Sequence, residues 1–282
     1  MYIHLKKNKL FSVIIFIIIS ISIYYIFLKK NDFVNKPLIN IDEINYDQRE
    51  YEDFIKIIKS GINPNKDLPI IAHAGGGYKK LTYTNSIDSL QLNKKNYDLF
   101  ELDFFLTDDG KLVCAHDWSV NLKTFSQFQI YVNEKKDFKP CTYITLQSWL
   151  KSNPDKRIVT DIKNDNLLGL RFISKNFDNF EKIFIPQIYT PNQYQKVKDM
   201  GYEDIIWTLY RYNKNNKKVI KSLKKMNLFA VTMPKNRAQS ELPIYLKKNK
   251  IKSYVHTINS EKEYFLYTKY FKIDQIYSDW IK

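Results

Sequence analysis

The sequence predicts an α/β protein built as one parallel (β/α)8 barrel, the TIM-barrel class, and three observations carry this prediction. The chain has 282 residues, enough to bury one substantial core. From residue 68 onward, short apolar runs alternate with stretches of helical periodicity, as expected for strands separated by helices. Histidines and acidic residues recur at or just after the C-terminal ends of these runs, where such barrels place their chemistry.

The barrel is expected to occupy residues 67–282. Its eight predicted strands are residues 68–73, 98–104, 157–161, 182–188, 204–209, 228–232, 252–257 and 273–278. Helical stretches are predicted at residues 85–93, 191–199, 215–225 and 260–270. The stretch from Trp118 to Lys156 is longer than an ordinary connection, so we expect a small insertion after the second strand, with a helix near Leu146–Lys151.

The first thirty residues predict a membrane anchor. Residues 11–28 contain no charge and have lysines on both sides, and an apolar run of this length is about enough to span a bilayer. A cleaved signal peptide is the alternative, but the bulky residues Tyr24–Leu28 leave no small-x-small cleavage site. We therefore expect one uncleaved transmembrane helix in residues 1–30. The short basic N-terminus would stay inside, leaving the long domain outside the cytoplasm.

Residues 31–66 are predicted to be a juxtamembrane linker followed by a helix. The helix is expected over residues 47–60, which are amphipathic, and Gly61 stops it. We expect it to pack beneath the barrel.

The predicted second strand carries two carboxylates on one face. Phe100, Leu102 and Phe104 face one side of this strand, and Glu101 and Asp103 face the other. An edge strand with a hydrated face would explain this alternation. Buried carboxylates, however, require a cationic partner, and Mg²⁺ or Ca²⁺ is the natural one for oxygen ligands.

Two of the four histidines flank this carboxylate pair. His73 and His116 lie at the ends of predicted strands, where a lone histidine would more often be structural. Two such residues bracketing carboxylates favour catalysis, because imidazole titrates near neutrality and one ring can accept a proton while the other donates one.

Further candidates follow from their positions near strand ends. Asp161 would add a third carboxylate to the metal site formed with Glu101 and Asp103. Lys163 follows on the same strand face and could pair with a phosphate, although Asp161 and Lys163 could instead pair only with each other. Gly75, in a run of three glycines, could offer a backbone N–H to phosphate or lie in a flexible loop. Trp118 could wall the pocket or pack at the barrel rim.

These motifs resemble the glycerophosphodiester phosphodiesterase family, within the superfamily of phosphatidylinositol phospholipase C-like barrels. That family carries His-Arg-Gly, Glu-Asn-Thr, Glu-x-Asp, Thr-x-Asp-Gly, His-Asp and Glu-x-Lys in this order. The corresponding segments here are His73-Ala74-Gly75, Thr84-Asn85-Ser86, Glu101-Leu102-Asp103, Thr107-Asp108-Asp109-Gly110, His116-Asp117 and Asp161-Ile162-Lys163. The resemblance covers residues 68–282. It implies a metal-dependent phosphoric diester hydrolase that uses the two histidines as acid and base.

Three residues depart from the family pattern. Ala74 replaces the arginine that helps to hold the phosphate, and Thr84 replaces the accompanying glutamate. Asp161 replaces a glutamate and shortens that ligand arm by one methylene. We therefore expect the substrate's charge to be met by Lys163, by the metal or by a loop lysine such as Lys79 or Lys80.

The function expected is hydrolysis of a glycerophosphodiester, a lysophospholipid or a glycerol-phosphate polymer. One alternative is a phospholipase-type enzyme that forms a cyclic phosphate. Another is a non-catalytic module that binds phosphorylated glycans or lipids through the altered site. The net charge of +15 suits an anionic substrate or membrane surface. Because the lysines are scattered and no nucleic-acid-binding motif occurs, we expect no nucleic-acid partner.

The only two cysteines are Cys114 and Cys141. They could form a disulfide if the domain is exported. Alternatively, Cys114 is simply a small buried residue on its strand.

Overall fold

The computed structural model describes residues 38–65, 67–116 and 123–282. The predicted transmembrane helix at residues 11–28 and the predicted pocket residue Trp118 lie outside the described residues. Within the described ranges, no helix is both long enough and apolar enough to cross a membrane.

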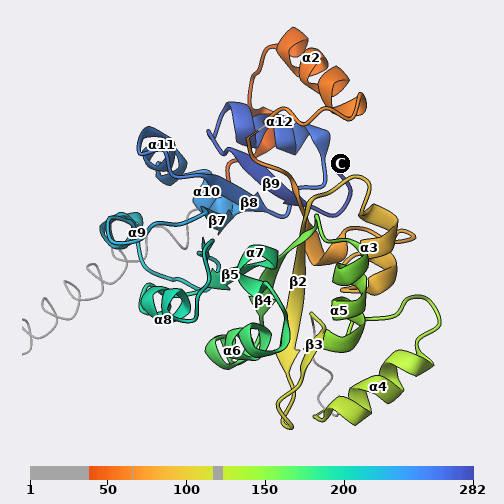
Figure 1. Ribbon diagram of the computed structural model, residues 1–282. Coiled ribbons are helices and arrows are strands. Elements are labelled where there is room, and N and C mark those ends of the chain that lie inside the picture. The colour runs from red at the N-terminus through yellow and green to blue at the C-terminus, as the bar shows by residue number, and fades with distance from the viewer. Residues whose placement is uncertain (1–37, 66, 117–122) are drawn as a thin grey trace, which may run out of the picture. The chain divides into compact units, whose positions relative to one another are not determined.

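Eight parallel strands form a closed barrel, which confirms the predicted fold class (Figure 1). The strands are β1 Ile71–Ala72, β2 Leu99–Leu106, β4 Arg157–Ile162, β5 Phe184–Ile188, β6 Ile206–Thr208, β7 Ala230–Pro234, β8 Ser253–His256 and β9 Gln275–Ser278. Closure occurs at β1, which pairs with β2 on one side and with β9 on the other. A further strand, β3 (Leu112–Cys114), runs antiparallel to β2 and extends it into a hairpin.

The interior of the barrel is built from alternate residues of the strands, because successive side chains of a strand point to opposite faces. Each strand of the barrel contributes one residue to a buried apolar layer. The strand residues of this layer are Ile71, Leu99, Val159, Ile185, Ile206, Ala230, Tyr254 and Tyr277, and Leu68, which precedes β1, joins them. This layer fills the end of the barrel where the strands begin, and it supports the residues nearer the C-terminal ends of the strands.

Helices follow the strands and begin at side-chain caps. Ser86, Asp165 and Ser260 each accept a hydrogen bond from the first turn of the helix that follows. The helices of the barrel unit that follow β1 and β4–β8 are α3 Ile87–Asn93, α6 Asn166–Asn176, α7 Phe180–Ile183, α8 Gln193–Asp199, α10 Lys235–Ala238, α11 Leu242–Lys248 and α12 Glu261–Lys269.

Residues 213–225 belong to a unit separate from the rest of the described chain. This segment contains α9 (Asn216–Leu223), which lies within the predicted helix 215–225. The side chain of Asn215 caps it by accepting a hydrogen bond from the N–H of Lys218.

The insertion after the second strand contains two helices where one was expected. These are α4 (Phe125–Glu134) and α5 (Tyr143–Ser152), and each begins with a capping box, at Thr124 and Thr142 respectively. Helix α5 packs against α3 and β3. Helix α4 also contacts β3, so both helices hold the insertion against the rest of the fold.

The predicted N-terminal helix is present as α2 (Gln48–Lys59), preceded by a short 3-10 turn, η1 (Ile41–Glu43). Its Phe54 contacts Tyr264 and Phe265 of α12 through edge-to-face rings 5.2 and 5.4 Å away. Figure 1 shows α2 (orange) beside α12 (blue), although they are far apart in sequence. The helix thus packs on the outer helical layer.

Candidate active site

The apolar interior of the barrel changes to a polar layer two residues further along most strands. Positions that continue the inward face of the apolar layer are His73, Glu101, Asp161, Gln187, Thr208, Thr232, His256 and Asp279. This change occurs at the C-terminal end of the barrel, where the strand periodicity and the start of the loops bring polar side chains together.

A pocket of about 170 Å³ opens above this layer. It is lined by His73, Tyr83, Glu101, Asp103, His116, Asp161, Lys163, Gln187, Thr208, Tyr210, His256, Thr257 and Tyr277. Six of the eight residues predicted for the site therefore line one cavity. The pocket is smaller than the roughly 300–1,000 Å³ of pockets that enclose whole drug-sized ligands.

Three buried carboxylates lie together on β2 and β4. Ligand oxygens of Glu101, Asp103 and Asp161 all lie within 4.8 Å of one another. Asp103 and Asp161 are aligned in the register of the two parallel strands, which explains why the groups meet. Three hard oxygen donors in this spacing suit a divalent cation such as Mg²⁺ or Ca²⁺.

Lys163 forms ion pairs with two of these carboxylates. Its Nζ lies 2.5 Å from Asp103 Oδ1 and 2.8 Å from Asp161 Oδ2. Burial alone would lower the pKa of Lys163, but the nearby charges of Asp103, Asp161 and Glu101 outweigh burial and raise it. The ammonium is therefore permanently charged, and its charge is balanced within the site.

Two tyrosines hold Asp161 in addition to Lys163. The hydroxyl of Tyr189 donates to Asp161 Oδ1, and that of Tyr210 lies 2.9 and 3.1 Å from the two carboxylate oxygens. Burial would raise the pKa of Asp161, but the charge of Lys163 and these hydrogen bonds lower it. Asp161 is consequently ionised and oriented before any ligand arrives.

Glu101 and Asp103 are held by backbone and amide groups. The N–H of Ala74 donates to Glu101 Oε2 at 2.8 Å, and Ala74 adopts a left-handed conformation with φ of 49°. Burial, together with the charges of Asp103 and Asp161, raises the pKa of Glu101 well above its usual value. Asn85 clamps Asp103 twice: its Nδ2 donates to Oδ2 at 2.9 Å, and its Oδ1 accepts from the backbone N–H at 2.8 Å.

His73 is oriented by a chain of hydrogen bonds from residues that follow β9 and β8. Its Nδ1 lies 2.9 Å from Asp279 Oδ1, and Asn259 Nδ2 donates to Asp279 Oδ2 at 2.7 Å. A carboxylate bound at Nδ1 favours the tautomer with its proton there and leaves Nε2 for chemistry.

The ring of Tyr83 contacts both histidines. Its centroid is 4.6 Å from that of His73 and 4.5 Å from that of His116, in edge-to-face geometry. Tyr83 lies in the loop after β1 and lines the pocket from there. Its side chain is 45% exposed, and its backbone is left-handed. The two imidazoles therefore line the same cavity, each beside the ring of Tyr83.

His256 forms an uncharged part of the pocket wall. Its Nε2 is buried without a hydrogen-bond partner among the described residues. Burial, and secondarily the neighbouring His73, lower the pKa of His256 to about 4. The ring is thus neutral at physiological pH and lies between Tyr210 and Tyr277, with centroid separations of 5.9 and 6.1 Å.

Some residues considered from the sequence lie apart from the pocket. Gly75 does not line it in the described chain; its carbonyl accepts from Asn93 Nδ2 at 3.3 Å, and it packs so closely on Ser89 that a Cβ there would lie 2.4 Å from the hydroxyl oxygen. A backbone contact of Gly75 with phosphate remains a prediction. Thr84 is buried, and its hydroxyl lies 3.0 Å from that of Ser86.

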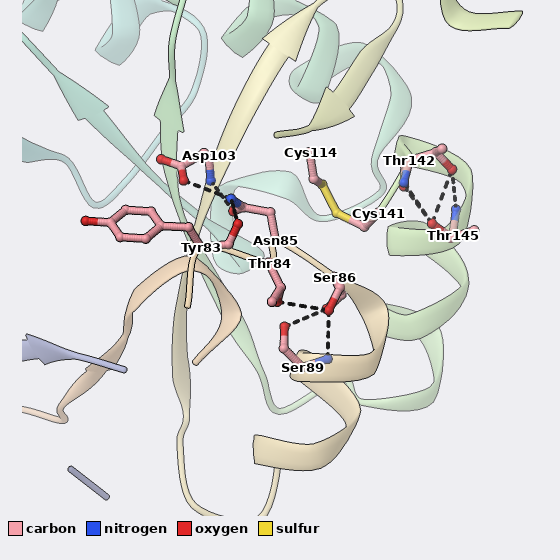
Figure 2. Close-up of a disulfide and its surroundings, with 10 residues drawn as sticks. All are labelled: Tyr83, Thr84, Asn85, Ser86, Ser89, Asp103, Cys114, Cys141, Thr142 and Thr145. Atoms are coloured by element: carbon pink, nitrogen blue, oxygen red, sulfur yellow. Dashed lines mark hydrogen bonds between the residues drawn. A yellow bond between two sulfur atoms is a disulfide. The ribbon is translucent and has the colours of Figure 1, made fainter. Parts of the chain in front are cut away.

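A disulfide lies behind the site. Cys114 on β3 is bonded to Cys141, just before α5, with a Cα–Cα distance of 5.0 Å. The N–H of Cys141 donates to the carbonyl of Asn85 at 2.9 Å. Figure 2 shows Asn85 between this disulfide and Asp103, so the covalent link supports the loop that clamps a carboxylate of the site.

Sequence reasoning did not identify several residues that build the site. They are Tyr83, Asn85, Tyr189, Tyr210 and Asp279 as positioning groups. Signals existed for four of them. Asn85 matches the asparagine of the Glu-Asn-Thr motif. Asp279 lies two residues beyond the apolar-layer residue Tyr277, and Tyr189 and Tyr210 lie four residues beyond Ile185 and Ile206, so these three continue the inward-facing alternation.

Comparisons with solved structures identify the same fold. A glycerophosphodiester phosphodiesterase from Parabacteroides distasonis is 18% identical with a TM-score of 0.58, covering 75% of this chain and 92% of that chain. One from Thermotoga maritima is 20% identical with a TM-score of 0.57, covering 75% and 94% respectively. A phosphodiesterase from Oleispira antarctica, in complex with the product sn-glycerol-3-phosphate, is 12% identical with a TM-score of 0.58, covering 76% and 94%.

No protein-family model matches the sequence, and no curated protein matches it significantly. The resemblance expected from the motifs is therefore confirmed at the level of the fold: the chain shares the barrel of glycerophosphodiester phosphodiesterases.

Proposed function

We propose that this protein is a metal-dependent phosphodiesterase that hydrolyses a glycerophosphodiester or a related glycerol-phosphate lipid or polymer. The observation that supports it best is one small pocket that combines two histidines, three clustered carboxylates and a lysine. The shared barrel adds support, since the similar Oleispira antarctica phosphodiesterase is in complex with the product sn-glycerol-3-phosphate.

The carboxylates of Glu101, Asp103 and Asp161 would hold the divalent cation. Bound there, Mg²⁺ or Ca²⁺ would neutralise charge on the phosphoryl oxygens. Asp161 is ionised and oriented for this role by Lys163, Tyr189 and Tyr210. Glu101 must lose its proton to join the site, because its raised pKa favours the neutral acid.

The two histidines would move protons on opposite sides of the phosphorus. With Nδ1 held by Asp279, His73 presents Nε2 for proton exchange. His116 lines the same pocket and also contacts Tyr83. One ring would accept a proton from the attacking group, which is water or a substrate hydroxyl, while the other protonates the departing alcohol oxygen.

We further propose that the catalytic domain acts outside the cytoplasm, held by a helix in residues 11–28. The uncharged run supports the anchor, and the disulfide between Cys114 and Cys141 supports an oxidising compartment. Cysteine alkylation in intact cells would test this: labelling of both thiols without a reductant would place the domain in a reducing compartment and contradict the proposal.

The activity is tested with the full-length chain in a non-ionic detergent. Glycerophosphocholine, glycerophosphoethanolamine, lysophosphatidylcholine and a glycerol-phosphate oligomer are each offered with Mg²⁺, Ca²⁺ or chelator, beside a His73→Ala/His116→Ala variant. Cation-dependent hydrolysis that the variant lacks supports the proposal, and phosphorus NMR detects any cyclic phosphate. Full activity in the variant, or an unchanged rate in chelator, contradicts it.

A further inference from the structure

The site has few positive charges left for the substrate. Position 74 carries an alanine, and its contribution to the site is a backbone N–H donated to Glu101. The ammonium of Lys163 is shared between Asp103 and Asp161. Neither Lys79 nor Lys80 is among the described residues that line the pocket. A substrate with more than one negative charge would therefore need another cation near the pocket.

Arg211 supplies such a cation at the rim. Its guanidinium carbon lies 4.4 Å from the ring centroid of Tyr189 and 5.1 Å from that of Tyr210. Its Nη1 donates to the carbonyl oxygen of Lys163 at 3.3 Å. Both tyrosines donate hydrogen bonds to Asp161. The guanidinium therefore packs against two residues that position a carboxylate of the pocket.

The guanidinium is available for a ligand. Arg211 is exposed, and it forms no ion pair with any carboxylate of the described chain. Stacking on two aromatic rings restricts a guanidinium while leaving N–H groups at its edge free for planar, bidentate recognition of phosphate or carboxylate.

The size of the pocket determines what reaches Arg211. About 170 Å³ is below the roughly 300–1,000 Å³ of pockets that enclose whole drug-sized ligands. Such a space suits the scissile phosphodiester and one compact alcohol. Arg211 itself is not among the residues that line the pocket, whereas the preceding Tyr210 is. The rest of a longer substrate must extend out of the pocket. A substrate segment that extends past Tyr210 reaches the guanidinium of Arg211.

We propose that Arg211 binds a second anionic group of the substrate, outside the pocket, and so selects polyanionic glycerol-phosphate substrates over zwitterionic ones. This inference rests on the proposed phosphodiesterase activity and specifies its substrate class. The net charge of +15 is consistent with a polyanionic substrate. The ligand chemistry is a phosphate or carboxylate attached, through a polyol, to the scissile phosphodiester.

The test compares two substrates with the full-length chain and its bound divalent cation. A glycerol-phosphate oligomer carries anionic groups beyond the scissile bond, and glycerophosphocholine carries a cation there. Arg211→Ala is expected to raise KM for the oligomer about tenfold or more, with kcat/KM for glycerophosphocholine unchanged or higher. Arg211→Lys should recover part of the loss, because it restores charge without the planar fork. Arg171→Ala, which removes an exposed arginine from α6, is the control.

Ionic strength provides a second measurement that a purely structural role would not change. KM for the oligomer should rise with salt in the unsubstituted chain and depend less on salt in Arg211→Ala. Equal losses for both substrates would mean that Arg211 acts only by supporting the tyrosines, and would overturn the inference. No effect on either substrate would also overturn it. If the unsubstituted chain hydrolyses neither substrate, the proposed activity itself fails, and this inference with it.

Discussion

His73 is held by Asp279 across the seam where the barrel closes, with Nδ1 2.9 Å from Oδ1. The two residues are 206 positions apart in the chain. They meet because β1 pairs in parallel with β9, so that the residues following these two strands emerge side by side. This contact sets the tautomer of the imidazole before substrate binds.

Asp279→Asn is expected to lower kcat while keeping the fold. Asparagine retains the size and a hydrogen bond but can favour the wrong tautomer of His73 and no longer stabilises its protonated form. A fall of about 10²-fold or more in kcat is expected, measured at saturating substrate. Asp199→Asn, an exposed site on α8, is the matched control. An unchanged kcat would show that His73 does not depend on Asp279.

Lys163→Met should destabilise the chelated protein. Removing the ammonium leaves the buried carboxylates of Asp103 and Asp161 without their cationic partner. Breaking a buried pair in this way typically costs about 3–5 kcal/mol, and thermal unfolding in chelator measures it. Adding Mg²⁺ or Ca²⁺ should recover part of the loss by supplying another cation. Lys151→Met, at an exposed position of α5, should unfold like the unsubstituted chain; an equal loss in both variants would argue against the pairing.

In the presence of chelator, the Glu101→Gln variant should be more stable than the unsubstituted chain, and the difference should grow as pH rises. The pKa of Glu101 is raised in the folded state, so above its unfolded value the folded protein binds more protons than the unfolded chain. Stability is therefore lost as pH rises from about 4.5 until the folded pKa is passed, by up to about 1.4 kcal/mol per pH unit. Glutamine does not ionise and escapes this loss.

The measurement for Glu101 is the difference in Tm between variant and unsubstituted chain from pH 5 to 8. The difference should widen with pH, and a divalent cation should reverse it by binding the ionised carboxylate. A pH-independent difference would mean that Glu101 ionises as freely in the folded state as in the unfolded chain.

Replacing both Cys114 and Cys141 by alanine should lower stability without disabling the site. For a sequence separation of 27 residues, chain entropy predicts a loss of about 3.5 kcal/mol. In a domain of this size that corresponds to a fall in Tm of about 7–14 °C. The hydrogen bonds of Asn85 to Asp103 involve no sulfur, so kcat well below Tm should persist. A reductant should lower the Tm of the unsubstituted chain alone; equal sensitivity of the double variant would contradict this account.

The strand positions of the carboxylates and histidines could be predicted because they depend on local patterns. Alternation along β2 places Glu101 and Asp103 on one face whatever the rest of the chain does. The apolar residues that end each strand likewise indicate where polar groups such as His73 and Asp161 begin. Predicting these positions requires only two rules: side chains alternate along a strand, and barrels of this class place their functional residues at the C-terminal ends of the strands.

The partners of these residues could not be predicted, because they arise from pairing between distant strands. Asp279 meets His73 only when the barrel closes, and Tyr210 meets Asp161 across 49 residues of chain. The first helix of the insertion, α4, was not predicted, although the capping box formed by Thr124 and Gln127 is a local signal that could have found it.

The sequence alone thus determined the type of fold and the chemical groups at its site, because both are encoded in alternation and strand ends. Tertiary structure decided which charges balance one another. It placed Lys163 between two carboxylates, two tyrosines on Asp161, and Arg211 on those tyrosines at the rim. Such contacts depend on strand register and barrel closure, which no short stretch of the chain specifies.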